Sequence, residues 1–497
     1  MNVLARVVAS LVIGLVLLGC ANTPSQSSPE QATRDELLTP TQLREDFRAL
    51  YEGLQRAHIN LFANRTREEF DQSSAETLAS LNRPMTKAEA QIHFQLFVAQ
   101  GRVAHARIDA PMDAFEAFRE SGGKIFPFGV RISEGRVFVA QNLSGIAEIA
   151  PGDEIVAING QSAEHWVRRL RQHISADSDY LADAILEPQF TVALWLELGA
   201  VETFQVRFLT HSGRRLDLSI PARSRTEMRA TSPAAPAALE IDPTVREARI
   251  IPGGVAYLRP GVFMNIADGG DPFDPTAFHQ FVDSAFERFL AEDATSLLID
   301  LRDNPGGDNS FSDHMIAWFA DRPFRFSSDF RVRVSPEAIT ANAARLEHAS
   351  PDGISRQYAE AYARASTGDI IHFPIPMAQP RAGARFTGRV FILVNRRSFS
   401  NAVSIAAIVQ DYRFGQILGE PTADLATTYG AMETFSLPNS GIVVGFPKAH
   451  IIRPSGDERV QGVTPDFVIA TPIIEPTDDP VLQEALRRVE DLSHAPR

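Results

Sequence analysis

Two apolar segments that each end in a polar turn constrain this chain more than any other feature. The first, Leu298–Leu301, ends in Arg-Asp-Asn-Pro-Gly-Gly, which places glycines at 306 and 307. The second, Val390–Val394, ends in Asn-Arg-Arg-Ser-Phe-Ser, and a helix-like apolar run follows Ser400. Each segment is typical of a buried strand, and the alternation of strands with helices favours an α/β core.

The residues at the two turns suit acyl-transfer chemistry. Glycines lack a Cβ, so backbone N–H groups at Gly306 and Gly307 can approach a reacting atom. A serine at a strand-to-helix corner exposes its hydroxyl in front of helix N-terminal N–H groups. Two adjacent strand ends can therefore supply a nucleophile and an oxyanion hole. Asp300 and Arg302 flank the first strand and are expected to form an ion pair or to support the turn rather than to react. Taken singly, each segment is equally compatible with an ordinary core strand and its turn.

Further short segments follow in a fixed order along the chain: Gln410-Asp411, Gly419-Glu-Pro-Thr422, Leu437-Pro-Asn-Ser-Gly441, Gly462-Val-Thr-Pro-Asp466 and Asp479–Leu486. Together with the two strands they resemble the C-terminal-processing (tail-specific) serine peptidases, across most of the chain after its leader. The resemblance implies a ClpP/crotonase-like catalytic domain that acts on peptide or protein substrates, without a cofactor or metal.

The resemblance also indicates a nucleophile and its oxyanion hole. Ser398 and Ser400 compete for the nucleophile's place, and counting back from Asp411 at the family's offset selects Ser400. Alone, a serine at such a corner is most often a helix N-cap. The oxyanion would be held by the backbone N–H of Gly306 or Gly307 and by that of Asn401.

The general base is harder to assign. Tail-specific members use a lysine, but the matching position holds Leu425. A second branch, resembling the tricorn-protease core, uses a histidine from the N-terminal helical region and a late glutamate, which here would be His105 and Glu458. Asp457 is the alternative to Glu458, and Lys448 is the nearest later lysine. An imidazole with a pKa of about 6.5 suits general-base work at neutral pH.

The N-terminus has the pattern of a lipoprotein leader. An apolar run, Val7–Leu18, is short for a membrane span, and Leu17-Leu-Gly-Cys20 resembles a lipobox that contains the chain's one cysteine. Residues 1–20 are therefore predicted to be a lipoprotein signal peptide, with Cys20 lipidated and 21–36 a flexible tether. The alternative is an ordinary cleaved signal peptide with an incidental cysteine.

The rest of the chain divides into three predicted domains and a linker, an α/β multidomain architecture. Thr39 and Thr66 have the spacing of capping boxes, and short strands with Pro-Gly-Asp and Asn-Gly turns resemble a PDZ domain. A small structural β-domain without ligand is the alternative for that segment. The predicted parts are an N-terminal helical region (37–118), a PDZ-like domain (119–225), a linker (226–249) and the peptidase domain (250–497).

The charge balance limits the possible partners. The formal net charge is −14, which disfavours binding to nucleic acid or to an anionic lipid surface.

The resemblance and the leader together imply a bacterial cell-envelope serine endopeptidase that is lipid-anchored in the outer membrane, faces the periplasm and forms an acyl-enzyme on Ser400. The alternative is a catalytically inactive peptidase-like binding or scaffold lipoprotein. The oligomeric state stays open.

Overall fold

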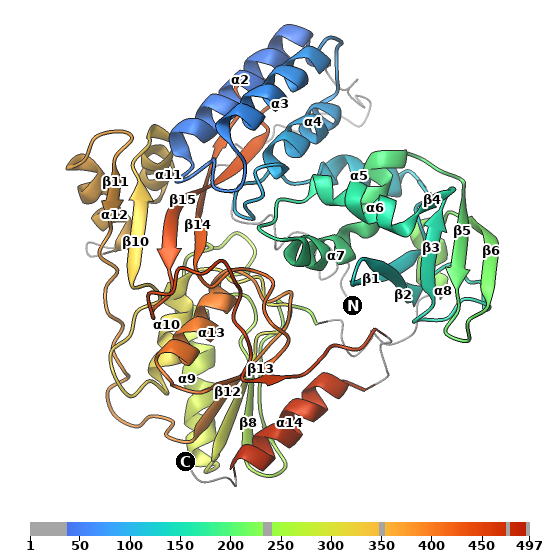
Figure 1. The fold of residues 1–497 in the computed structure, drawn as a ribbon. Coiled ribbons are helices and arrows are strands. Elements are labelled where there is room, and N and C mark those ends of the chain that lie inside the picture. The colour runs from blue at the N-terminus through green and yellow to red at the C-terminus, as the bar shows by residue number, and fades with distance from the viewer. Residues whose placement is uncertain (1–36, 232–240, 347–352, 474–477, 494–497) are drawn as a thin grey trace.

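The computed structural model describes residues 37–231, 241–346, 353–473 and 478–493 (Figure 1). The predicted signal peptide, Cys20 and the tether lie outside these residues. Within them, no helix is both long enough and apolar enough to span a membrane. The described residues form three sheets.

Four helices open the described chain. At Thr39 and Thr66 the side chain accepts the N3 backbone N–H while the N3 side chain reaches back, so both predicted capping boxes are confirmed. The apolar residues Leu43, Phe47, Leu50 and Leu54 of α2 are fully buried. The helices are α2 (Pro40–Ala57), α3 (Arg67–Ser80), α4 (Lys87–Ala99) and α5 (Met112–Glu120).

An antiparallel sheet with strand order β1-β2-β3-β5-β6, in which β4 pairs with β3, forms the second unit, here called the β1–β6 unit. It contains a long helix, α7, that the sequence did not reveal. A further helix, α8, occupies the start of the range expected to be a linker. The elements are β1 (Phe128–Ser133), β2 (Arg136–Asn142), β3 (Glu154–Ile158), β4 (Gln161–Ser162), α6 (Ala163–Leu170), η1 (Arg171–His173), α7 (Asp179–Leu198), β5 (Thr203–Leu209), β6 (Arg215–Pro221) and α8 (Arg225–Thr231).

The third unit holds the two apolar segments as neighbouring parallel strands. Its sheet has the order β16-β13-β12-β9-β8-β7, and only β7 runs antiparallel to its neighbour. Its elements are β7 (Glu247–Ile251), β8 (Val255–Arg259), α9 (Thr276–Ala291), β9 (Ser296–Asp300), α10 (Asn309–Ala317), β12 (Arg389–Val394), α13 (Asn401–Asp411), β13 (Gln416–Gly419), β16 (Phe467–Val468) and α14 (Pro480–Ser493).

Helices cover both faces of this parallel sheet (Figure 1). Leu297 and Ile299 pack among residues of α9, α10 and α13, whereas Leu298 packs on the α14 side with Val481 and Val489. Burial on both faces explains why β9 and β12 read as continuous apolar runs. The predicted ion pair is confirmed, because Arg302 contacts the buried Asp300 at 2.6 Å.

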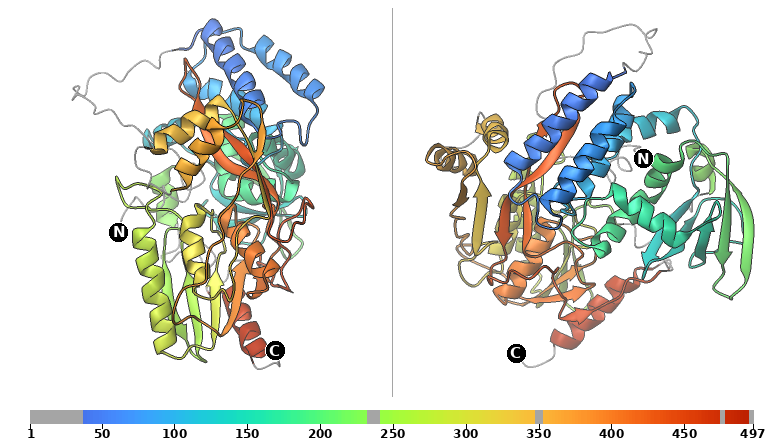
Figure 2. Two further views of the ribbon diagram at one scale, coloured as in Figure 1. Left: turned by 90° about the vertical axis from the view of Figure 1, so that its left-hand side faces the viewer. Right: turned by 45° about the horizontal axis from the view of Figure 1, so that its top comes forward.

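The remaining sheet links the helices to the parallel sheet. Arg107 and Gly445 exchange backbone hydrogen bonds of 3.1 and 2.8 Å, which places the segment after α4 beside β15. The two views of Figure 2 show α2 lying along β15, with which it makes contacts. The elements are β10 (Asp329–Arg333), α11 (Pro336–Leu346), α12 (Ile354–Ala363), β11 (Ile370–His372), β14 (Thr428–Ser436) and β15 (Val443–Ile452).

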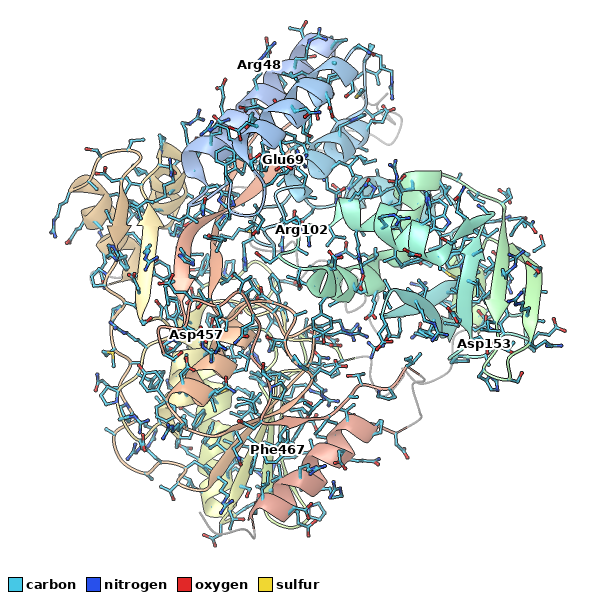
Figure 3. All side chains as sticks on the ribbon, in the orientation of Figure 1. Arg48, Glu69, Arg102, Asp153, Asp457 and Phe467 are labelled. Carbon is cyan, nitrogen blue, oxygen red and sulfur yellow. The ribbon has the colours of Figure 1, made fainter. Side chains whose placement is uncertain are left out.

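Ion pairs attach the β1–β6 unit to its neighbours. Arg396, in the turn after β12, contacts Glu187 of α7 at 2.9 Å and donates to the carbonyl of Ile132 at 2.9 Å. Arg102, labelled in Figure 3 between the helices and the β1–β6 unit, pairs with Asp179 at 2.9 Å. The contacts of Arg396 therefore place the serine-rich turn against the β1–β6 unit.

Candidate active site

Ser400 occupies a strained turn between β12 and α13. Its backbone has φ +53° and ψ −120°, a conformation that costs a residue with a side chain about 1–3 kcal/mol. The residue is only half-buried. A strained strand-to-helix turn with an accessible serine is the backbone geometry of a nucleophile elbow.

The glycine corner after β9 packs directly against this turn. A Cβ added to Gly306 would lie 2.6 Å from the backbone nitrogen of Asn401 and 2.9 Å from the Cβ of Ser400. Both Gly306 and Gly307 have positive φ, at +90° and +130°. The two strand ends therefore meet, as the sequence predicted, and only glycine fits at their contact.

The amides at this corner divide into used and unused donors. The N–H of Gly306 donates to the Asn304 side chain at 2.9 Å, so it stabilises the turn and is not available for an oxyanion. Within the described residues, the N–H groups of Gly307 and Asn401 donate no hydrogen bond. Of the predicted oxyanion donors, these two have the required freedom, and the N-terminus of α13 adds its dipole.

Ser398 has a structural role. It is fully buried, and its hydroxyl donates to the carbonyl of Leu301 at 2.7 Å and accepts the N–H of Asn395 at 3.0 Å. These bonds tie the end of β9 to the end of β12. Between the two competing serines, only Ser400 has an accessible side chain.

His105 lies beside the turn that carries Ser400. Its ring stacks on Phe399, with centroids 5.1 Å apart and planes 24° apart. The Nδ1 atom is buried and has no hydrogen-bond partner in the described part of the chain. Burial and the nearby Arg107 charge lower the pKa of His105 to about 4, and the Tyr429 carbonyl opposes them. The imidazole is thus neutral at pH 7, but the expectation of an ordinary imidazole pKa is wrong because the ring is buried.

The structure gives the two acidic candidates other partners. Glu458 forms an ion pair with Arg331 at 3.2 Å, and its side chain is 55% exposed. The Asp457 carboxylate pairs with Arg459 at 2.6 Å, and these hydrogen bonds lower its pKa to about 2. Neither residue makes a hydrogen bond to His105, so the geometry adds no support for Glu458 as its orienting group.

A third carboxylate, which was not among the predicted site residues, contacts Ser400. Asp424 is fully buried and accepts the backbone N–H of Ser400 at 2.6 Å. It precedes Leu425, the residue at the lysine position, which is itself buried. An acidic residue inside the apolar stretch Ala423–Ala426 was the available signal for this contact.

Lys448 does not lie free to act as a base. Its side chain is buried, its ammonium is 2.7 Å from Glu433 and it lies over the ring of Tyr358 at 4.0 Å. Arg345 contacts the same carboxylate. Burial lowers the pKa of Lys448, while the Glu433 charge opposes that shift. The lysine completes a buried charge network.

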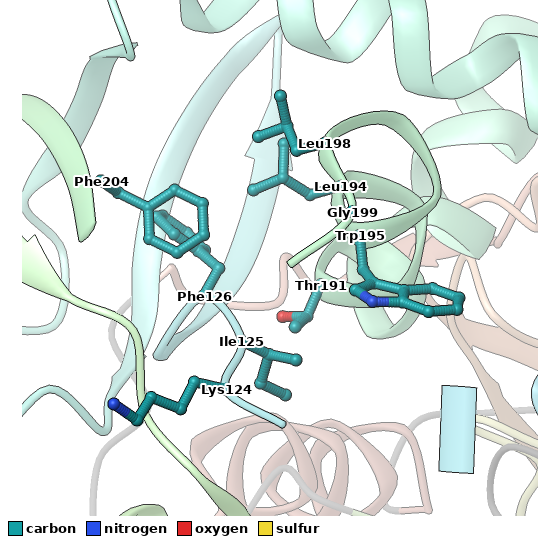
Figure 4. A pocket seen from close by; sticks show the side chains of 9 residues that line it. All are labelled: Lys124, Ile125, Phe126, Thr191, Leu194, Trp195, Leu198, Gly199 and Phe204. Carbon is teal, nitrogen blue, oxygen red and sulfur yellow. The ribbon is translucent and has the colours of Figure 1, made fainter. Parts of the chain in front are cut away.

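Two hollows lie away from Ser400 and His105, since neither residue lines them. One, of about 10 Å³, has space for a single water and lies in the β1–β6 unit (Figure 4). A larger open depression of about 540 Å³ has polar walls that include Asp411, Arg453 and Asp457. The described residues contain no group of three acidic, histidine or cysteine side chains that could hold a metal. The small hollow is lined by Lys124, Ile125, Phe126, Thr191, Leu194, Trp195, Leu198, Gly199 and Phe204.

Comparison with known proteins identifies the domain that carries this site. Residues 256–469 match the family model of Peptidase family S41, so the chain carries an S41 peptidase domain. No curated protein sequence matches the chain.

Two solved structures of one protein, CPAF, share the fold at low sequence identity. Mature CPAF complexed with lactacystin has a TM-score of 0.63 at 15% identity, covering 91% of this chain and 98% of that chain. Mature CPAF alone gives 0.62 at 16% identity, covering 91% and 97%. The photosystem II D1 C-terminal processing protease gives 0.41 at 17% identity, covering 90% and 97%.

The contact between Gly306 and Ser400 predicts a large effect of one methyl group. Gly306→Ala should reduce the reaction of Ser400 with a fluorophosphonate by about 10²-fold, because the new Cβ displaces the turn. Gly213→Ala is the matched control, since Gly213 also has positive φ (+80°) but open space around its Cβ position. Both variants strain the backbone at a positive φ, but only Gly306→Ala also displaces the Ser400 turn. Equal labelling rates for the two variants would show that the contact is unimportant.

Proposed function

We propose that the S41 domain of this chain works as a serine peptidase in which Ser400 is the nucleophile and His105 the general base. The observation that supports this most directly is the strained turn at Ser400, with Gly306 against its Cβ and His105 stacked on the preceding residue. A structural serine has no need of such strain, which is typical of functional sites.

The site residues can perform each proton transfer of acyl transfer. The neutral imidazole of His105 accepts the hydroxyl proton as the oxygen of Ser400 attacks a peptide carbonyl. The N–H groups of Gly307 and Asn401 stabilise the resulting oxyanion. Collapse of the intermediate releases the amine, which takes the proton from His105, and leaves an acyl-enzyme. Water, deprotonated by the same imidazole, then hydrolyses the ester.

Substrate and location are part of the proposal. The resemblance to tail-specific peptidases supports endopeptidase action on peptides or on the C-terminal regions of proteins. The lipobox at Cys20 supports a lipid anchor, and Ala21 at the next position supports the outer membrane with the enzyme facing the periplasm. Glu458 stays the candidate to orient His105, although in the structure it pairs with Arg331.

A non-catalytic scaffold is the second candidate function. Two observations favour it: Leu425 replaces the expected lysine, and the Nδ1 atom of His105 lacks an orienting partner in the described residues. In that case the fold would bind peptides without cleaving them.

Labelling with a fluorophosphonate separates the two functions. The wild-type protein should be labelled and should hydrolyse peptides, because Ser400 is accessible and strained. Ser400→Ala should lose both properties with an unchanged unfolding transition, whereas Ser398→Ala should still react and be less stable, since its bonds join the two strand ends. A wild-type protein that is neither labelled nor active would favour the scaffold function. Loss of labelling in Ser398→Ala but not in Ser400→Ala would show that Ser398 is the nucleophile.

The base assignment predicts a distinct pH profile. His105→Ala should lower kcat/KM by about 10²–10⁴-fold, the usual contribution of a general base. Wild-type kcat/KM should fall as pH drops through the His105 pKa of about 4, because the protonated imidazole cannot accept a proton. Lys448→Met is the control and should change the rate little, since Glu433 keeps Arg345 as its partner. A near-normal rate in His105→Ala would refute the mechanism.

The anchor proposal has its own test. Cys20→Ser should move the protein from the membrane fraction to the soluble fraction, or leave an unprocessed precursor, because the acyl chains attach to the thiol. Metabolic labelling with a fatty-acid analogue and fractionation of both forms measure this. Unchanged lipid labelling and fractionation would rule out lipidation at Cys20.

A further inference from the structure

Asn304, in the turn after β9, hydrogen-bonds to three neighbouring strand ends at the candidate site. The sheet order places β9 between β12 and β8. The Nδ2 atom of Asn304 donates to the carbonyl of Gly261, which follows β8, at 2.8 Å, and its Oδ1 atom accepts the N–H of Gly306 at 2.9 Å. Its backbone carbonyl accepts the N–H of Phe399, in the turn after β12, at 2.9 Å. Asn304 is buried, so loss of its side chain would leave these groups without a replacement from water.

The direction of the Gly307 N–H follows from the peptide unit that it shares with the Gly306 carbonyl. That carbonyl accepts the N–H of Phe263 at 2.9 Å, and the N–H of Asp308 donates to the Phe263 carbonyl at 2.8 Å. In a planar trans peptide the N–H points opposite to the C=O. The Gly307 N–H therefore points away from Phe263, and it donates no hydrogen bond within the described residues.

Asn304 holds both partners of this pairing. Its Oδ1 atom fixes the glycine corner at Gly306, and its Nδ2 atom fixes Gly261, two residues before Phe263. Gly306 and Gly261 both have positive φ, at +90° and +69°. Glycine reaches this region without a steric penalty but also leaves it easily, so a bond from outside is needed to keep one conformation.

The same corner is joined to the second oxyanion donor. The Nδ2 atom of Asn401 donates to the carbonyl of Asp308 at 3.2 Å and to the hydroxyl of Ser312 at 3.0 Å. Asn401 and Ser312 are both buried. A shift of the glycine corner would therefore change the position of the Gly307 N–H relative to that of Asn401.

We propose that Asn304 is a positioning residue that fixes the Gly307 N–H as an oxyanion donor by joining the glycine corner to the segment from Gly261 to Phe263. It acts through the backbone on either side of it. Donors that are held in place stabilise a developing negative charge because they need not reorient as it forms. The kinetic consequence rests on the proposed peptidase function, whereas the hold on the glycine corner does not.

The kinetic test replaces Asn304 in the full chain. Asn304→Ala removes both side-chain bonds and should lower kcat by about 10²-fold with little change in KM, because an oxyanion donor acts in the transition state and not on the bound substrate. Asn304→Asp keeps an acceptor for the Gly306 N–H and loses the donor to Gly261. Its kcat should fall by only about 10-fold, the equivalent of one hydrogen bond.

Asn142→Ala is the matched control. Asn142, at the end of β2, has the same bonding pattern: its Oδ1 atom accepts the N–H of Ser144, two residues on, at 3.0 Å, and its Nδ2 atom donates to the carbonyls of Ile146 and Ile149 at 2.9 and 2.7 Å. The substitution removes a comparable set of bonds in the β1–β6 unit. It should lower the free energy of unfolding but leave kcat unchanged.

Hydrogen exchange of the Gly306 amide, followed by NMR, gives a readout without catalysis. Exchange should accelerate in Asn304→Ala, which lacks the acceptor, and stay slow in Asn304→Asp and in Asn142→Ala. If Asn304→Ala does not fold, Asn304→Asp carries the test alone, and a wild-type kcat in that variant overturns the inference.

The outcomes separate this inference from the proposed function. If the wild-type protein neither hydrolyses peptides nor reacts with a fluorophosphonate, the peptidase function fails, and exchange of the Gly306 amide alone decides whether Asn304 holds the corner. Unchanged exchange in Asn304→Ala overturns the inference. In an active enzyme, so does a kcat of Asn304→Ala that falls no further than that of Asn142→Ala.

Discussion

The close approach of two strand ends determines the rest of this site. A Cβ on Gly306 would overlap the backbone nitrogen of Asn401 and the Cβ of Ser400. This contact joins the glycine corner, whose Gly307 N–H donates no hydrogen bond within the described residues, to the N-terminal end of α13. It requires β9 and β12 to be adjacent and parallel, which the helices on both faces of the sheet stabilise.

Sequence patterns predicted the local features of this structure well. Continuous apolar runs indicated strands, capping boxes marked helix starts, and the serine offset selected the residue with positive φ. Each of these signals depends on a few consecutive residues. Helix α7 was not predicted, for two reasons. It is buried on more than one face, so its sequence lacks an amphipathic stripe, and it contains Pro188, which usually ends a helix.

Local sequence patterns did not predict the contacts between segments that are far apart in the chain. Glu458 was chosen from its place near a motif, but Arg331 from another strand pairs with it. Asp424 looked unremarkable in an apolar loop, and only the folded chain brings it to the amide of Ser400. The low pKa of His105 likewise comes from burial against Phe399, which no local spacing reveals.

His105 stacks on Phe399 beside Ser400 although it lies far away in the sequence, on a segment that the bridge from Arg107 to Gly445 attaches to β15. A growing polypeptide therefore contains the histidine long before the serine and the strands that position it. Before the strands on either side of Ser400 have paired, His105 and Ser400 stay apart, so the proposed peptidase activity depends on completion of the parallel sheet. Local detachment of the N-terminal helices would separate the same two residues while the parallel sheet stays folded, which makes the pairing of Arg107 with Gly445 a control point for the proposed activity.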